Sequence, residues 1–168
     1  MTYDKNCKLW PNNTDVFFRD KTIQPIQQVG PHCVATCMAM ITTSHPDNFH
    51  GKINTQDPVS WSIALSEYGM KLAYCPTDAR KLKFYMDELL ELDDLFTLSY
   101  YTPLNPQLIL RDPDELGWIC GSHIVVLHGN NILDPATGNT TSFEKHACIE
   151  CHTKRIFRLV HTYSNRGI

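Results

Sequence analysis

One cysteine of this chain lies where a reactive thiol is expected. Cys33 follows Gly30-Pro31, which interrupts the backbone, and it opens the small, apolar segment 33–41, which predicts a helix. A helix N-terminus stabilises a thiolate through its free N–H groups and the positive end of its dipole. We therefore expect Cys33 to be a nucleophile in the first turn of this helix.

A thiol nucleophile needs a histidine to act as general base and a side-chain oxygen to orient the imidazole ring. His123 precedes the apolar run 124–127, and Asp134 ends the short segment 132–134 after the turn sequence 128–131. If these segments pair as a β-hairpin, the two side chains meet near its open end. The sequence therefore predicts a Cys-His-Asp triad.

Acyl transfer by a cysteine also requires hydrogen-bond donors for the oxyanion that forms on the attacked carbonyl. Gln27 and Gln28 both lie shortly before Cys33, whose own backbone N–H is the natural second donor. Losing one such donor typically costs about 3 kcal/mol of transition-state stabilisation. Either glutamine has the residue type and the position that this role requires.

Two stretches of the chain resemble a known superfamily. Segment 27–35 resembles the papain-like cysteine peptidases, in which a glutamine six residues before the cysteine completes the oxyanion hole, so the matching residue is Gln27. Segments 121–127 and 134–138 look like the histidine and aspartate strands of the bacteriocin-leader-processing (double-glycine) peptidases and their stand-alone relatives. The resemblance leaves 43–118 unmatched and implies a papain-like α+β fold. The catalytic residues that it implies are Cys33, His123, Asp134 and Gln27.

The triad describes how a carbonyl is attacked and leaves the substrate open, because peptidases, isopeptidases, deamidases and acyltransferases share this machinery. We expect hydrolysis of a peptide or isopeptide amide bond through an acyl-thioester intermediate, with a protein or peptide as substrate. A deamidase or acyltransferase is the alternative among enzymes. A non-catalytic papain-like effector that binds a partner protein is the alternative outside them, and the oligomeric state is open.

Three residues near the expected site are candidates for substrate contacts, namely His32, Trp118 and Ser122. His32 directly precedes the nucleophile and is alternatively an exposed loop residue, whereas Trp118 stands next to a strand and is alternatively a core aromatic. Cys37 lies one helical turn beyond Cys33 and further from the dipole end, so it is the weaker candidate for the nucleophile.

A second group of possible ligands lies near the C-terminus. The string Cys148-x-x-Cys151-His152 matches the pattern for haem attachment, but such attachment belongs to exported proteins and the polar N-terminus lacks an export signal. Zinc bound by these thiols and a nearby histidine is chemically reasonable, although no second Cys-x-x-Cys pair completes a tetrahedral site. We expect ordinary thiols here, and neither a metal nor a cofactor.

The composition indicates one soluble domain spanning 1–168. The chain is 42% hydrophobic, and its net charge of −3 shows no basic excess of the kind that nucleic-acid binding needs. No apolar run reaches the length of about 18 residues that a membrane-spanning helix requires. The seven cysteines are an odd number, which with the polar N-terminus favours a reducing, cytoplasmic location, while delivery as an effector remains open.

The elements that position the candidate residues are predicted in the order of helices first and an antiparallel sheet after them. Asp57-Pro58 is typical of a helix start and Gly69 of a helix end, while the apolar periodicity of 79–92 predicts another helix capped by Thr77 or Asp78. Residues that favour β-structure predict strands over 95–101, 119–127, 132–134 and 155–162. The predicted fold class is therefore α+β.

Overall fold

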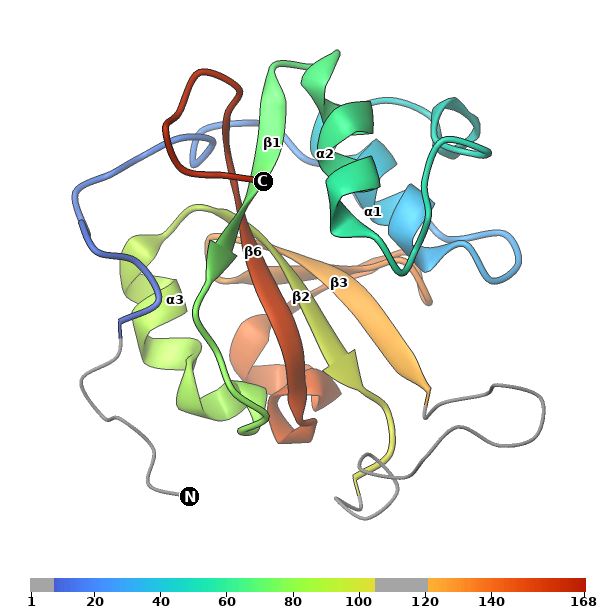
Figure 1. The fold of residues 1–168 in the computed structure, drawn as a ribbon. Helices are drawn as coiled ribbons and strands as arrows, with labels where there is room; N and C mark the ends of the chain where they lie inside the picture. The colour runs from blue at the N-terminus through green and yellow to red at the C-terminus, as the bar shows by residue number, and fades with distance from the viewer. Residues whose placement is uncertain (1–7, 105–120) are drawn as a thin grey trace.

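The computed structural model describes residues 8–104 and 121–168, and these form an α+β fold with three α-helices and one six-stranded antiparallel sheet (Figure 1). The helices are α1 (Cys33–Thr42), α2 (Pro58–Ser66) and α3 (Met86–Leu92). The strands are β1 (Met70–Cys75), β2 (Leu95–Tyr101), β3 (Ser122–His128), β4 (Asn131–Asp134), β5 (Asn139–Ser142) and β6 (Thr153–His161). Their order across the sheet is β1-β6-β2-β3-β4-β5, and the predicted fold class is confirmed.

Helices cover both faces of the sheet (Figure 1). α1 and α2 pack on one face, where Met38 and Trp61 belong to the same hydrophobic cluster as Val126. α3 packs on the other face, where Leu89 shares a cluster with Val125. Since Val125 and Val126 are neighbours on β3, the alternation of the strand sends them into different clusters. A strand covered on both faces is apolar throughout, which explains the continuous apolar run in this part of the sequence.

A buried ion pair at the sheet binds the backbone of residues 15–18. Arg158 on β6 and Asp94 just before β2 are fully buried, and Nη2 of the arginine lies 2.6 Å from Oδ2 of the aspartate. Asp94 also accepts hydrogen bonds from the N–H groups of Phe17 and Phe18, while Arg158 donates to the carbonyl of Asp15. The segment that leads to α1 is thereby held against the sheet.

Most of the predicted elements are confirmed with small shifts of their ends. α1 begins at Cys33, as predicted, and Asp57 caps α2 by accepting a hydrogen bond from the N–H of Val59 at 3.1 Å. The predicted hairpin is formed by β3 and β4, and Gly129 in its turn has a φ of 61°. Of the predicted strand 119–127, residues 119 and 120 lie outside the described residues.

The predicted helix over 79–92 is wrong in its N-terminal half. Asp78 does not cap a helix, because its carboxylate accepts hydrogen bonds from Arg80 and from the Tyr85 hydroxyl. A short 3-10 turn at Leu82–Phe84 follows, and α3 begins only at Met86. The two outermost strands of the sheet, β1 and β5, were not predicted.

Within residues 8–104 and 121–168, no helix combines the length and the apolar character needed to cross a lipid bilayer.

Candidate active site

The start of α1 presents Cys33 to a cavity of about 690 Å³. Gly30, with a φ of 69°, turns the backbone shortly before the helix, and Cys33 is the first helical residue. The N–H groups in the first turn of a helix have no acceptor within it, so they can stabilise a negative charge there. Of the five cysteines in the described part of the chain, Cys33 is the one that is not buried. It therefore combines access from the cavity with a site suited to an anion.

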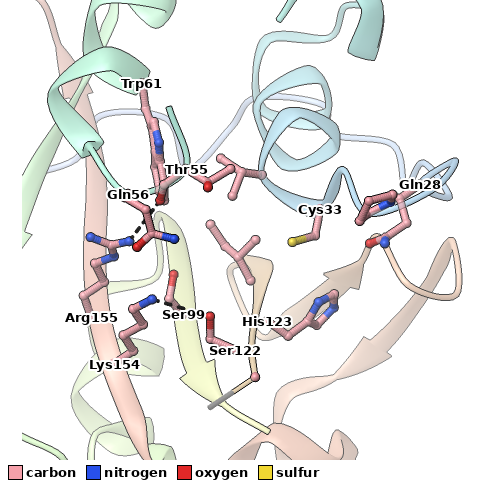
Figure 2. A pocket seen from close by; sticks show the side chains of 14 residues that line it. Gln28, Cys33, Thr55, Gln56, Trp61, Ser99, Ser122, His123, Lys154 and Arg155 are labelled. Atoms are coloured by element: carbon pink, nitrogen blue, oxygen red, sulfur yellow. Dashed lines mark hydrogen bonds between the residues drawn. The ribbon is translucent and has the colours of Figure 1, made fainter. Parts of the chain in front are cut away.

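The β3–β4 hairpin brings His123 and Asp134 together at its open end. His123 is the second residue of β3, Asp134 is the last of β4, and Nε2 of the histidine lies 2.8 Å from Oδ1 of the aspartate. The ring of Tyr100 packs edge-on against the His123 ring, with 5.8 Å between centroids. Figure 2 shows Cys33, His123 and Gln28 at one end of the cavity. The three predicted triad residues thus lie in one place.

The surroundings of His123 favour its charged form. Burial by itself lowers the pKa of this ring, whose side chain is 16% exposed. Hydrogen bonding with Asp134 and with Cys33, together with the charges of these groups, outweighs burial and raises the pKa of His123 from 6.5 to about 9. Because Nε2 is bonded to Asp134, Nδ1 is the nitrogen left for Cys33. At neutral pH His123 is therefore an imidazolium between a carboxylate and a thiol group.

Asp134 is bonded by two histidines, and the second, His146, was not predicted. Nε2 of His146 lies 2.8 Å from Oδ2, and the N–H of Ala136 donates to Oδ1 at 2.9 Å. Nδ1 of His146 accepts from the N–H of Cys148, so its proton is on Nε2 and is donated to Asp134. Burial by itself raises the pKa of Asp134, but the hydrogen bonds from His123, His146 and Ala136 hold it well below its ordinary value. The carboxylate is therefore ionised and fixed in orientation.

The structure brings Gln28, and not Gln27, to the cavity of Cys33 (Figure 2). Gln28 lines the cavity together with Cys33 and His123, whereas Gln27 is exposed and lines a separate, smaller cavity. Nε2 of Gln28 donates one hydrogen bond to the Gly30 carbonyl at 2.9 Å and carries a second N–H, while Oε1 is buried without a partner in the described residues. The six-residue spacing implies Gln27, but the glutamine that lines the cavity of Cys33 is Gln28.

The loop after Asp134 determines which glutamine faces the cavity. The N–H of Gln28 donates to the carbonyl of Pro135 at 2.7 Å, which anchors the backbone at this point. Gly138, with a φ of 69°, packs so closely that a Cβ there would lie 2.8 Å from Cβ of Gln27. Since neighbouring side chains of an extended segment point in opposite directions, this anchoring directs Gln28 toward the cavity and Gln27 away from it.

Of the three candidates for substrate contacts, one lines the cavity of Cys33 in the described part of the chain. Ser122, at the start of β3, lines the cavity, and its hydroxyl accepts a hydrogen bond from Lys154 at 3.4 Å. His32 is exposed and instead lines the smaller cavity, where its ring centroid lies 4.7 Å from that of His50. His32 is therefore not part of the lining of the cavity that contains Cys33. Trp118 lies outside the described residues.

The other thiols considered are buried. The thiol of Cys37 lies inside the core and donates to the carbonyl of Ile124 at 3.6 Å, and burial raises its pKa well above the ordinary value. Burial also raises the pKa of Cys148 to about 12 and moves that of Cys151 in the same direction. Across the described ranges, no three His, Cys, Asp or Glu side chains are grouped as a metal site requires.

No protein-family model, no curated protein and no solved structure matches this chain.

Proposed function

We propose that this chain is a papain-like cysteine hydrolase that cleaves a peptide or isopeptide amide bond through an acyl-thioester intermediate. The observation that carries the proposal is the position of His123, whose ring lies between Asp134 at 2.8 Å and the thiol of Cys33 at the start of α1. A histidine that only stabilised the fold would need neither a thiol partner nor a cavity. An accessible nucleophile, a general base bonded to it and an orienting carboxylate are together the requirements of covalent catalysis.

In the acylation step, the Cys33 thiolate attacks the carbonyl carbon of the scissile amide and a carbon–sulfur bond forms. The Cys33 N–H and the second N–H of Gln28 Nε2 hold the resulting oxyanion. The carbon–nitrogen bond then breaks, and His123 transfers its proton to the leaving amine. The products of this step are the free amine and a thioester on Cys33.

In the deacylation step, a water molecule attacks the thioester carbonyl and neutral His123 accepts a proton from it. The carbon–sulfur bond breaks, the carboxylic acid leaves, and the thiolate and imidazolium are restored. Asp134 keeps Nδ1 of His123 directed at Cys33 throughout, because it binds Nε2 on the other side of the ring. His146 does not contact Cys33 in this scheme. It donates a hydrogen bond to the second carboxylate oxygen of Asp134 and thereby helps to hold that carboxylate in place.

The shape of the cavity supports an extended substrate. Its volume of about 690 Å³ lies within the usual range of about 300–1,000 Å³ for ligand sites. It runs from Cys33 across the end of the sheet to Trp61 and Arg155, as Figure 2 shows. Because the cavity extends from Cys33 past several side chains to Arg155, it can hold an extended segment of polypeptide with its scissile bond at Cys33.

The proposal is tested by incubating the protein with a library of mixed peptides and lysine-linked isopeptides and identifying new termini by mass spectrometry. We expect products from the wild-type protein and from Cys151→Ser, which removes a buried thiol outside the site. We expect none from Cys33→Ser or His123→Gln. Products that persist in Cys33→Ser, or their absence with correctly folded wild-type protein, would refute the proposal.

A further inference from the structure

A β-bulge in β6 directs two consecutive cations into the cavity of Cys33. Arg155 pairs with Ser99 on β2, and Thr153 pairs with Tyr100, so Lys154 is an extra residue on β6 at this point. Successive residues of a regular strand point to opposite faces of the sheet, and a bulge removes this restriction. Lys154 and Arg155 consequently both line the cavity (Figure 2).

The Arg155 guanidinium is oriented by an aromatic ring and has unused hydrogen-bonding capacity. Its Cζ lies 5.1 Å from the centroid of the Trp61 ring. Nη2 makes a long hydrogen bond of 3.4 Å to the carbonyl of Thr55, and Nε is buried without a partner among the described residues. In contrast, the buried guanidinium of Arg158 is paired with a carboxylate at 2.6 Å. Arg155 is therefore a fixed cation that can still accept an anionic partner.

Among the described residues, the charged side chains that line the cavity are all positive. Its lining there includes Lys154, Arg155 and the His123 imidazolium, but no aspartate or glutamate. Arg155 pairs with Ser99, and Ser99 pairs with Ile124, which follows His123 on β3. Two strand spacings of about 4.8 Å give a span of about 10 Å, which equals about three residues of an extended peptide.

We propose that Arg155 binds a carboxylate of the substrate, so that the preferred substrates are peptides with a negative charge about three residues from the bond that is cut. This inference rests on the proposed function of the site. A guanidinium binds a carboxylate through two parallel hydrogen bonds, and the contact with the Trp61 ring restrains the Arg155 side chain in the cavity. The carboxylate is either an acidic side chain or the C-terminus of the substrate, since both present the same two oxygens.

The test uses peptides that carry an electrophile and are compared in pairs. Peptidyl chloromethyl ketones place the peptide on the acyl side of Cys33, and N-chloroacetyl peptide amides place it on the leaving-group side. The thiolate displaces chloride from either group and forms a thioether. Each pair carries Glu or Gln at the second, third or fourth position from the electrophile, and a Gln peptide with a free C-terminus tests the other source of the carboxylate. The rate constant of Cys33 modification is measured by mass spectrometry.

We expect the Glu probe, or the probe with a free C-terminus, to modify wild-type Cys33 about tenfold faster than the neutral probe, as one charge-assisted hydrogen bond typically allows. The ratio should fall to about one in Arg155→Gln, recover in part in Arg155→Lys, and stay unchanged in Arg166→Gln, whose arginine does not line the cavity. Because both probes of a pair act on the same variant, a general loss of folding or reactivity cancels in the ratio.

A failure of the proposed function and a failure of the role of Arg155 give different results. If His123→Ala does not slow the modification of Cys33 by any probe, the proposed function fails and the inference fails with it. If modification depends on His123 but the wild-type ratio is near one at every position, or the ratio survives in Arg155→Gln, the carboxylate-binding role of Arg155 alone is overturned.

Discussion

Replacing Asp134 by asparagine is expected to bring the pKa of His123 from about 9 back toward its ordinary value of 6.5. Asparagine has nearly the same shape as aspartate but carries no charge. Hydrogen bonding with Asp134 leads the effects that raise the pKa of His123, and burial, which lowers it, remains in the variant. In the variant, His123 should therefore lose its proton near neutral pH.

The size of this effect follows from the two pKa values. At pH 7.5, a pKa of about 9 leaves about 97% of His123 as imidazolium, and a pKa of 6.5 leaves about 9%. The same difference stabilises the wild-type fold, because the folded protein binds the proton more tightly than the unfolded chain. This stabilisation is complete below pH 6.5 and is lost as the pH rises through about 9. At 1.36 kcal/mol for each pH unit, it amounts to at most about 3 kcal/mol.

The ring nitrogens of His123 report its pKa directly in a titration followed by nitrogen-15 NMR. Urea unfolding at pH 6.5 and pH 9.5 then measures the linked change in stability, which should be larger for the wild-type protein than for Asp134→Asn. Asp47→Asn is the matched control, because Asp47 pairs with the surface histidines His45 and His50. A His123 pKa that stays near 9 in Asp134→Asn would refute the role assigned to the carboxylate.

Three further substitutions test other parts of the account. Gly138→Ala should destabilise the fold by more than Gly51→Ala in thermal unfolding. Both glycines have positive φ, but a Cβ at Gly138 would collide with Gln27, whereas one at Gly51 meets nothing within 4 Å. His146→Phe removes a hydrogen bond to a buried carboxylate and should lower the free energy of unfolding by about 1.5–3 kcal/mol in urea titrations, with less loss in His146→Gln. Arg158→Met leaves a buried carboxylate unpaired and should cost about 3–5 kcal/mol by the same measurement; a cost below about 1 kcal/mol would contradict the anchoring role of the ion pair.

The parts of the site that the sequence predicts are those with local signals. Gly30-Pro31 followed by an apolar run marks the start of α1, and a short turn between two apolar segments marks the β3–β4 hairpin. The hairpin signal predicts that His123 and Asp134 meet, whereas the expectation that Cys33 lies beside them comes from the chemistry of cysteine hydrolases and from the resemblance to papain-like peptidases. The outer strand β1 has only a weak signal in the sequence, because Lys71 is the one polar residue among the apolar ones of Met70–Cys75.

The choice between Gln27 and Gln28 has no local signal. It depends on a hydrogen bond from Gln28 to Pro135 and on the close approach of Gly138 to Gln27, and both contacts join segments more than a hundred residues apart. Spacing along the chain therefore gives the residue type but not the side chain that faces the cavity. Contacts between distant segments decide such placements after local preferences are satisfied.

His146 was missed for a similar reason. Its ring reaches Asp134 from a pair of short 3-10 turns, Phe143–Lys145 and Ala147–Glu150, which have no apolar periodicity. The one clue in the sequence is a histidine just before a turn, where Nδ1 can accept a backbone N–H, as it does here from Cys148. The bulge at Lys154 was equally hidden, because it is defined by pairing with β2.

The pairing of Cys33 with His123 is tested by the rate at which iodoacetamide alkylates Cys33 at pH 7, followed by mass spectrometry in the wild-type protein and in His123→Ala. We expect Cys33 to be modified before the buried thiols Cys37, Cys75 and Cys148, and His123→Ala to slow this reaction by about tenfold or more. Equal rates in the two proteins, or modification of Cys33 no faster than that of the buried thiols, would contradict this pairing.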